Sequence, residues 1–124
     1  MSTKNSFLTR RIKSIGYACK GVIRLIKTEA NAQVQVFFAI FATIAGFYFD
    51  ISKTEWGFQI FCIGLVISLE AINTSIENLL DFIHPEQHKT IGKIKDISAG
   101  AVLIAATTAI CIGLIIYIPK IVIG

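Results

Sequence analysis

Long stretches without charge dominate the pattern of hydrophobic and polar positions along the chain. Residues 30–49 and 97–119 contain no charged side chain, and residues 56–80 contain only Glu70 and Glu77. Each stretch is close to or above the ~20 apolar residues that span a bilayer as a helix. The pattern therefore predicts three transmembrane helices, at about residues 30–49, 56–80 and 97–119.

A different pattern precedes the first span. Between Phe7 and Ile26, apolar residues recur at steps of three and four, and basic residues fall largely between them. This alternation is typical of an amphipathic helix that lies in the membrane surface with its bases toward anionic head groups. We predict such a helix over residues 6–28. It either only anchors the chain or also covers a cytoplasmic site, and Glu29 at its end favours the second role.

Composition supports a single membrane-embedded domain over residues 1–124. Hydrophobic residues make up 54% of the 124 positions, and charged residues make up 16%. A soluble fold of this size leaves much of its area exposed, so it could not hide this much apolar surface. The expected fold class is all-α integral membrane, with an N-terminal amphipathic surface helix followed by three transmembrane helices.

The basic residues indicate how the chain is oriented. Seven precede the first span and three lie between the second and third, whereas one separates the first two spans and one follows the third. Loops rich in Lys and Arg stay in the cytoplasm. We therefore expect the N-terminus and the 81–96 loop in the cytoplasm, and the 50–55 turn and the C-terminus outside. Because this topology accounts for the net charge of +4, we expect no nucleic acid partner.

Four polar residues form a stripe along the second span: Glu70, Asn73, Glu77 and Asp81. On a helix the three acids fall within about 40° of one another, with Asn73 about 60° to one side. An ionisable residue near the bilayer centre costs ~2.5 kcal/mol or more, so such residues indicate function by default. The alternative role is hydrogen bonding between helices. Two carboxylates on one stripe favour chemistry over that alternative.

Depth in the membrane separates the roles of the acids. If Trp56 marks the outer interface, Glu70 lies ~21 Å inward and Glu77 ~31 Å inward. Glu70 is then within the hydrocarbon, where a lipid hydroxyl could reach it as a general base. Glu77 is at the cytoplasmic boundary, where a water-soluble substrate could reach it. Together with another boundary carboxylate such as Glu29, it could hold magnesium through oxygen ligands.

The segment between the second and third spans adds further polar groups. His84 and His88 have the spacing of a zinc pair, but Pro85 between them weakens a helical arrangement. Solvent exposure is the preferred interpretation of these histidines. Lys95 and Asp96 begin the third span, within reach of a nucleotide at the cytoplasmic boundary. The chain has no glycine-rich phosphate loop ending in Lys-Ser/Thr, so any nucleotide site must be unconventional.

The sequence resembles one known family, the small bacterial diacylglycerol kinases and undecaprenol kinases. The stripe reads Glu70-Ala-Ile-Asn73-Thr-Ser-Ile-Glu77-Asn-Leu-Leu-Asp81, similar to the family signature E-x-x-N-S/T-S/A-I-E-x-x-x-D. Segments 16–21, 28–31 and 93–102 resemble other motifs of the family, in the same order. The resemblance implies a homotrimer in the bacterial inner (cytoplasmic) membrane, with sites between subunits. It implies transfer of the γ-phosphoryl group of ATP to the hydroxyl of a membrane lipid.

The match to these motifs also implies residue roles. Glu70 would be the general base, and Asn73 would support it. Glu29 and Glu77 would hold Mg²⁺ with ATP, and Arg10 would lie near both the nucleotide and the lipid. Further nucleotide contacts would come from Tyr17, Glu86, His88, Lys95 and Asp96.

The acceptor lipid stays open between undecaprenol and diacylglycerol. The diacylglycerol branch typically has Arg-Gln-Glu where this chain has Gln33-Val34-Gln35. Three other features look more like the undecaprenol branch: the Glu29, Asn31, Gln33 pattern, the Glu55-Trp56 pair and the closing Ile118-Pro119-Lys120. A polyprenol acceptor is therefore favoured.

The alternative function is a non-enzymatic membrane transport or assembly subunit. A transporter would also place carboxylates in a membrane helix, but polar groups would be expected through the outer half as well. Between Trp56 and Ser68 the second span offers only Gln59 as a strongly polar residue. A continuous polar path is therefore poorly supported.

Overall fold

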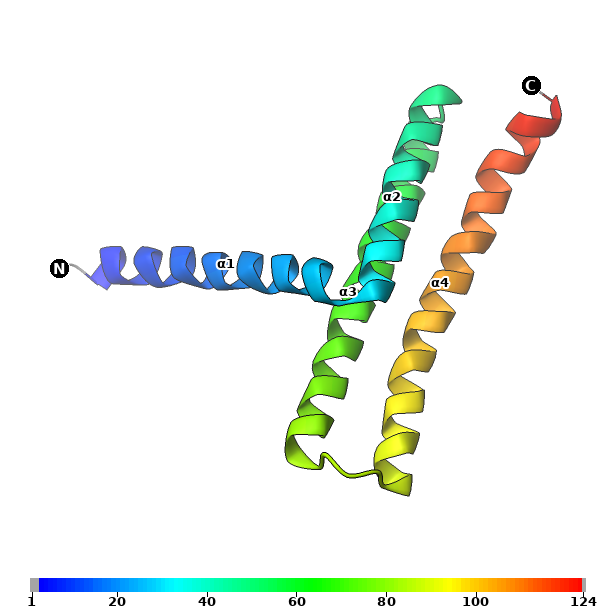
Figure 1. The fold of residues 1–124 in the computed structure, drawn as a ribbon. Coiled ribbons are helices and arrows are strands. Elements are labelled where there is room, and N and C mark those ends of the chain that lie inside the picture. Colours follow the sequence, from blue (N-terminus) through cyan, green and yellow to red (C-terminus); the bar gives the residue numbers. More distant parts are fainter. Residues whose placement is uncertain (1–2, 124) are drawn as a thin grey trace.

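The computed structural model describes residues 3–123, and this part of the chain is helical with short connections (Figure 1). The four helices are α1 (Thr3–Thr28), α2 (Ala30–Tyr48), α3 (Lys53–Ile83) and α4 (Lys89–Ile123). Helices α2, α3 and α4 are long and apolar enough to cross a membrane. The predicted all-α fold with three candidate membrane spans is confirmed.

Two helices extend beyond the predicted spans. Helix α3 continues to Ile83 instead of ending near residue 80, and α4 begins at Lys89 instead of residue 97. The sequence prediction was based on uncharged runs, which mark the bilayer and not the ends of a helix. A helix keeps its internal hydrogen bonds after it leaves the hydrocarbon, so charged residues extend α3 and α4 on the side of their connecting loop.

A sharp corner separates α1 from α2. Glu29 is in an extended conformation (φ −103°, ψ 116°) between the two helices, and α1 runs crosswise to the other three (Figure 1). The last carbonyls of a helix lack partners within it. Here the Gln33 side-chain amide donates to the backbone carbonyls of Ile26 and Lys27, at 3.0 and 3.2 Å. These bonds from α2 fix the direction in which α1 leaves the bundle.

The opposite end of the bundle contains the tight α2–α3 turn. Asp50 has a positive φ of 51°, a conformation that short polar side chains tolerate better than most. Ser52 then caps α3 reciprocally with Glu55: each side chain accepts a hydrogen bond from the other residue's backbone N–H. The turn brings the start of α3 against the end of α2.

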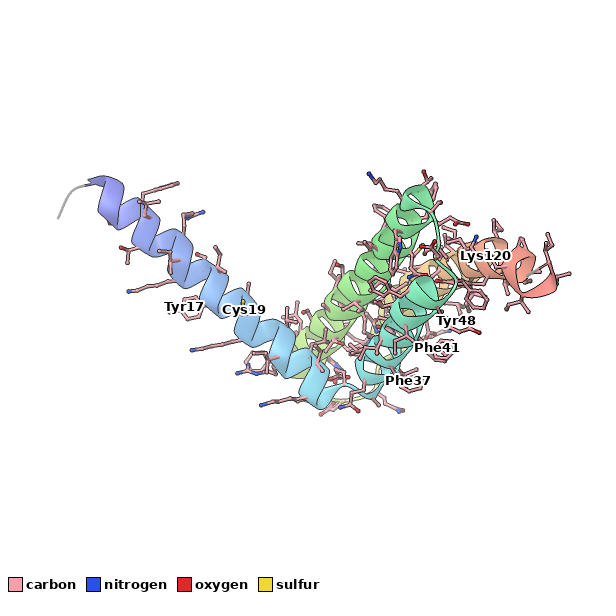
Figure 2. All side chains as sticks on the ribbon, turned by 90° about the horizontal axis from the view of Figure 1, so that it is seen from above. Tyr17, Cys19, Phe37, Phe41, Tyr48 and Lys120 are labelled. Atoms are coloured by element: carbon pink, nitrogen blue, oxygen red, sulfur yellow. The ribbon has the colours of Figure 1, made fainter. Side chains whose placement is uncertain are left out.

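Helix α3 is the central element of the bundle. It packs against α4, α2 and the end of α1. Few residues are buried in the single chain, and most large apolar side chains are exposed. Figure 2 shows Phe37, Phe41 and Tyr48 pointing away from the bundle. These faces fit contact with lipid or with a neighbouring chain.

A polar cluster joins three helices near the α2–α3 turn. Gln59 on α3 donates to the backbone carbonyl of Ala42 at 3.0 Å, and Tyr117 on α4 donates to Gln59 Oε1 at 2.5 Å. Close by, Lys120 forms an ion pair with Glu55 at 3.1 Å. Polar groups within a bilayer must be satisfied inside the protein. Both ends of the Gln59 amide are satisfied, which gives this residue a structural role and not a place on a transport path.

Candidate active site

Glu70 is the most deeply buried charged residue of the described chain, with 2% of its surface exposed. It lies in the middle of α3, where the Gln35 amide of α2 donates to its Oε1 at 3.0 Å. Its Oε2 has looser contacts, with Asn73 Nδ2 and Thr74 Oγ1, both at 3.5 Å. A buried carboxylate with one oxygen firmly held and the other loosely held is suited to accept a proton.

Asn73 connects the two carboxylates of the stripe. It is 6% exposed, and its Nδ2 group donates to Glu77 Oε1 at 3.2 Å as well as contacting Glu70. Within residues 3–123, no side chain or backbone group donates to its buried Oδ1. Glu70, Asn73 and Glu77 form a continuous polar centre, as their helical spacing predicted. We refer to these three residues as the α3 centre.

A cleft of about 700 Å³ lies between α1 and α3, on a face of α3 that does not include the three residues of the α3 centre. Thr74, which contacts Glu70, also lines this α1–α3 cleft. The α1 side of the cleft includes Arg24, Leu25 and Glu29. Glu29, the carboxylate expected at the membrane boundary, and Thr74, the neighbour of Glu70, therefore line the same cleft.

The loop between α3 and α4 is polar and exposed. Lys95 donates to Asp81 at 2.6 Å, so one of the predicted nucleotide contacts is paired with the last acid of the stripe. His88 Nδ1 accepts from the backbone N–H of Thr90, and Glu86 and His88 are exposed. Asp96 is also exposed, near the start of α4.

No group of three or more His, Cys, Asp or Glu side chains within residues 3–123 is arranged to hold a metal ion. His84 and His88 do come close, with ring centroids 5.4 Å apart. However, His84 Nδ1 is hydrogen-bonded to the Glu86 carbonyl at 2.8 Å. A zinc site in this loop was not the preferred interpretation of the sequence, and the geometry offers it no third ligand.

The predicted nucleotide residues of α1 lie apart from the others. Figure 2 shows Tyr17 on the part of α1 that projects beyond the three-helix bundle. Its side chain is 69% exposed and lies near Lys20, with the ammonium 5.9 Å from the ring centroid. Arg10 is also exposed, and it precedes Tyr17 on α1 by about two helical turns. A single chain thus brings Glu70, Asn73 and Glu77 together but leaves Arg10 and Tyr17 away from them.

Sequence reasoning missed two neighbours of Glu70, namely Gln35 and Thr74. Gln35 could have been singled out as a glutamine within an uncharged span, where an unpaired amide is costly. Thr74 carries a weaker signal, because threonine in a membrane helix commonly bonds to its own backbone.

Comparison with known proteins identifies the family. A profile described as "Prokaryotic diacylglycerol kinase" matches residues 16–117, which include the whole α3 centre. The chain belongs to this prokaryotic diacylglycerol kinase family. Among curated relatives, an undecaprenol kinase from Bacillus subtilis (strain 168) is 37% identical over 91% of this chain and 92% of its own length. A diacylglycerol kinase from Escherichia coli (strain K12) is 30% identical over 89% of this chain and 90% of its own length.

Family membership establishes the general activity. The chain is a multi-pass membrane protein and a lipid kinase of the diacylglycerol and undecaprenol kinase type, which uses ATP as its phosphoryl donor. The predicted enzyme class is confirmed. Within this family, the polar stripe of α3 is a candidate active site.

Proposed function

We propose that this enzyme phosphorylates a polyprenol, with undecaprenol as the preferred acceptor over diacylglycerol. The proposal is supported by the higher identity to the undecaprenol kinase, 37% against 30%. The single observation that carries the proposed chemistry is Glu70, a carboxylate buried at mid-helix in a candidate membrane span, whose neighbour Thr74 lines the α1–α3 cleft.

In the proposed reaction, the lipid hydroxyl approaches Glu70 through the α1–α3 cleft. Its oxygen bonds to the γ-phosphorus of ATP while the bond from that phosphorus to the bridging oxygen breaks and ADP leaves. The hydroxyl proton goes to the Glu70 carboxylate. Asn73 keeps Glu70 and Glu77 in a fixed relation, so positioning is the main contribution of the protein, as is general for phosphoryl transfer.

Magnesium fits the ligands that the chain offers. Mg²⁺ binds through oxygen, and one or two carboxylates suffice when substrate phosphates and water complete the shell. Glu77 and Glu29 would hold it, with Glu77 already oriented by the Asn73 amide at 3.2 Å. When bound, the ion would neutralise charge on the phosphates.

The nucleotide would be bound at the cytoplasmic end of α3 and α4. Proposed contacts are Arg10, Tyr17, Glu29, Glu77, Glu86, His88, Lys95 and Asp96. Lys95 and Asp81 pair at the surface, where an ion pair is worth little, so Lys95 can exchange Asp81 for a phosphate.

A homotrimer with sites shared between subunits would explain the position of α1. Arg10 and Tyr17 lie on a helix that projects away from its own bundle, so they would reach the α3 centre of a neighbouring copy (Figure 2). The large exposed apolar area of α2, α3 and α4 is consistent with such packing. The basic residues favour an N-terminus in the cytoplasm of a bacterial cell.

The first test is phosphate transfer from labelled ATP with magnesium in micelles, with undecaprenol and diacylglycerol compared side by side. We expect turnover of both lipids to fall at least about 100-fold in Glu70→Gln, to a residual rate that is still measurable, and undecaprenol to have the higher kcat/KM in the wild-type enzyme. Glu55→Gln is the matched control, because it removes a carboxylate from the first turn of α3, away from Glu70. A higher kcat/KM for diacylglycerol would reject the proposed acceptor, and full activity of Glu70→Gln would reject the proposed base.

A further inference from the structure

Gln35 is the polar contact that α2 makes with the α3 centre. Its side-chain Nε2 donates to Glu70 Oε1 at 3.0 Å, shorter than the contacts of Glu70 with residues on its own helix, at 3.5 Å. An ionised carboxylate has acceptors and no donor, so the amide must present its N–H group to Glu70. This requirement turns the carbonyl oxygen of Gln35 away from the carboxylate.

That carbonyl oxygen is buried and receives no hydrogen bond from residues 3–123. Gln59, the other glutamine that bridges α2 and α3, differs in this respect. It donates to Ala42 and accepts from Tyr117, so both ends of its amide are paired. Leaving a buried acceptor without a partner reduces stability. Within the described chain, the amide of Gln35 is therefore engaged by the Glu70 carboxylate alone, unlike that of Gln59.

The two carboxylate oxygens of Glu70 therefore differ in how closely their hydrogen-bond partners hold them. Oε1 is held by Gln35, whereas Oε2 has only the 3.5 Å contacts with Asn73 and Thr74. Thr74, one of the two neighbours of the loosely held oxygen, lines the α1–α3 cleft, whereas Glu70 itself does not. A base is effective when its accepting atom is free and its orientation is fixed.

We propose that Gln35 is a positioning residue for the phosphoryl transfer: by fixing Oε1 of Glu70, it presents Oε2 to the lipid hydroxyl. This inference rests on the proposed role of Glu70 as the base. Gln35 acts through Glu70 and does not itself exchange a proton with the substrate.

The test compares Gln35→Met with Gln59→Met in the full-length enzyme. Methionine keeps the length of the side chain and removes the amide. For Gln35→Met we expect kcat to fall about 10- to 100-fold while KM for ATP and for the lipid stay within about twofold, because only the alignment of the base is lost. For Gln59→Met we expect the reverse: a lower unfolding temperature with kcat of the folded enzyme unchanged.

A double-mutant cycle separates positioning from a general structural effect. In a Glu70→Gln background, adding Gln35→Met should lower the residual rate no further, because residues that act as a unit are not additive. An additional loss of rate, or a wild-type kcat in the single Gln35→Met variant, would overturn the positioning role and leave the kinase assignment intact. A wild-type enzyme that transfers phosphate to neither lipid would overturn the proposed function and the positioning role with it.

Discussion

At the residue scale, the α3 centre contains many hydrogen-bond acceptors and few donors, and the proposed chemistry rests on this imbalance. Glu70, Glu77 and Asn73 bring five oxygen atoms to one segment of α3, and the Asn73 amide contacts both carboxylates. Two carboxylates that share a low-dielectric site repel each other when both are ionised. An amide N–H between them reduces this repulsion, and a bound cation would reduce it further.

Asn73→Asp should therefore abolish turnover almost completely. The substitution keeps the shape of the side chain but replaces the bridging donor with a third carboxylate. We expect kcat to fall by at least about 100-fold, because the proposed base and the proposed magnesium ligand lose their fixed relation. Steady-state kinetics with ATP and undecaprenol measure the loss, and the oligomer size measured by size-exclusion chromatography should equal that of the wild-type enzyme. Retention of more than a tenth of wild-type kcat would contradict the catalytic importance assigned to the bridge.

At the element scale, the α2–α3 turn depends on one close approach. A Cβ atom at Gly46 would lie 2.6 Å from the Trp56 ring, which packs against Phe47 with ring centroids 4.9 Å apart. The glycine lets the start of α3 lie directly against α2. The Ser52–Glu55 capping box lies in the same turn, so helix capping and close packing both stabilise the start of α3.

Gly46→Ala should destabilise the bundle by about 1–3 kcal/mol, since an extra methyl in a tight contact forces side chains from their rotamers. The matched control is Gly57→Ala on α3, where a Cβ meets nothing within 4 Å. There the better helix propensity of alanine should leave stability equal or slightly raised. Unfolding in mixed micelles measures both variants. Equal stability of the two would contradict the role assigned to Gly46.

At the scale of the whole molecule, one chain is an incomplete enzyme in our proposal. The single chain buries few residues, and its surface helix extends away from the bundle (Figure 1). Apolar association within lipid depends on close packing, for which small residues are favoured. Residues 98–101 of α4 form such a small-residue run, Ser-Ala-Gly-Ala.

Gly100→Leu tests whether this run contributes to the packing between helices. A Cβ at Gly100 meets nothing within 4 Å in the single chain, so the first atom of a larger side chain is not obstructed within the isolated fold. If the run lies at a contact between subunits of the proposed trimer, the larger side chain should reduce oligomer size and turnover together, while helical content measured by circular dichroism is retained. Unchanged oligomer size and stability would place the subunit contact elsewhere.

The sequence by itself determined the features that depend on neighbours along the chain. Uncharged length predicted the three spans, and helical periodicity put Glu70, Asn73 and Glu77 together, because both properties are local. Helix ends were predicted less well: the start of α4 at Lys89 lies outside the uncharged run, since charge marks the edge of the bilayer and hydrogen bonding marks the end of a helix.

Only the tertiary structure decided which residues of different helices meet. The contact of Gln35 with Glu70, the paired amide of Gln59 and the corner at Glu29 all depend on the rotation and register of one helix against another. An apolar span looks much the same from every side in sequence, since lipid and protein partners have similar polarity. Hydrogen bonds between helices can therefore be identified only from the packed structure. They distinguish Gln59, which joins the helices of the bundle, from Gln35, which we propose positions the base.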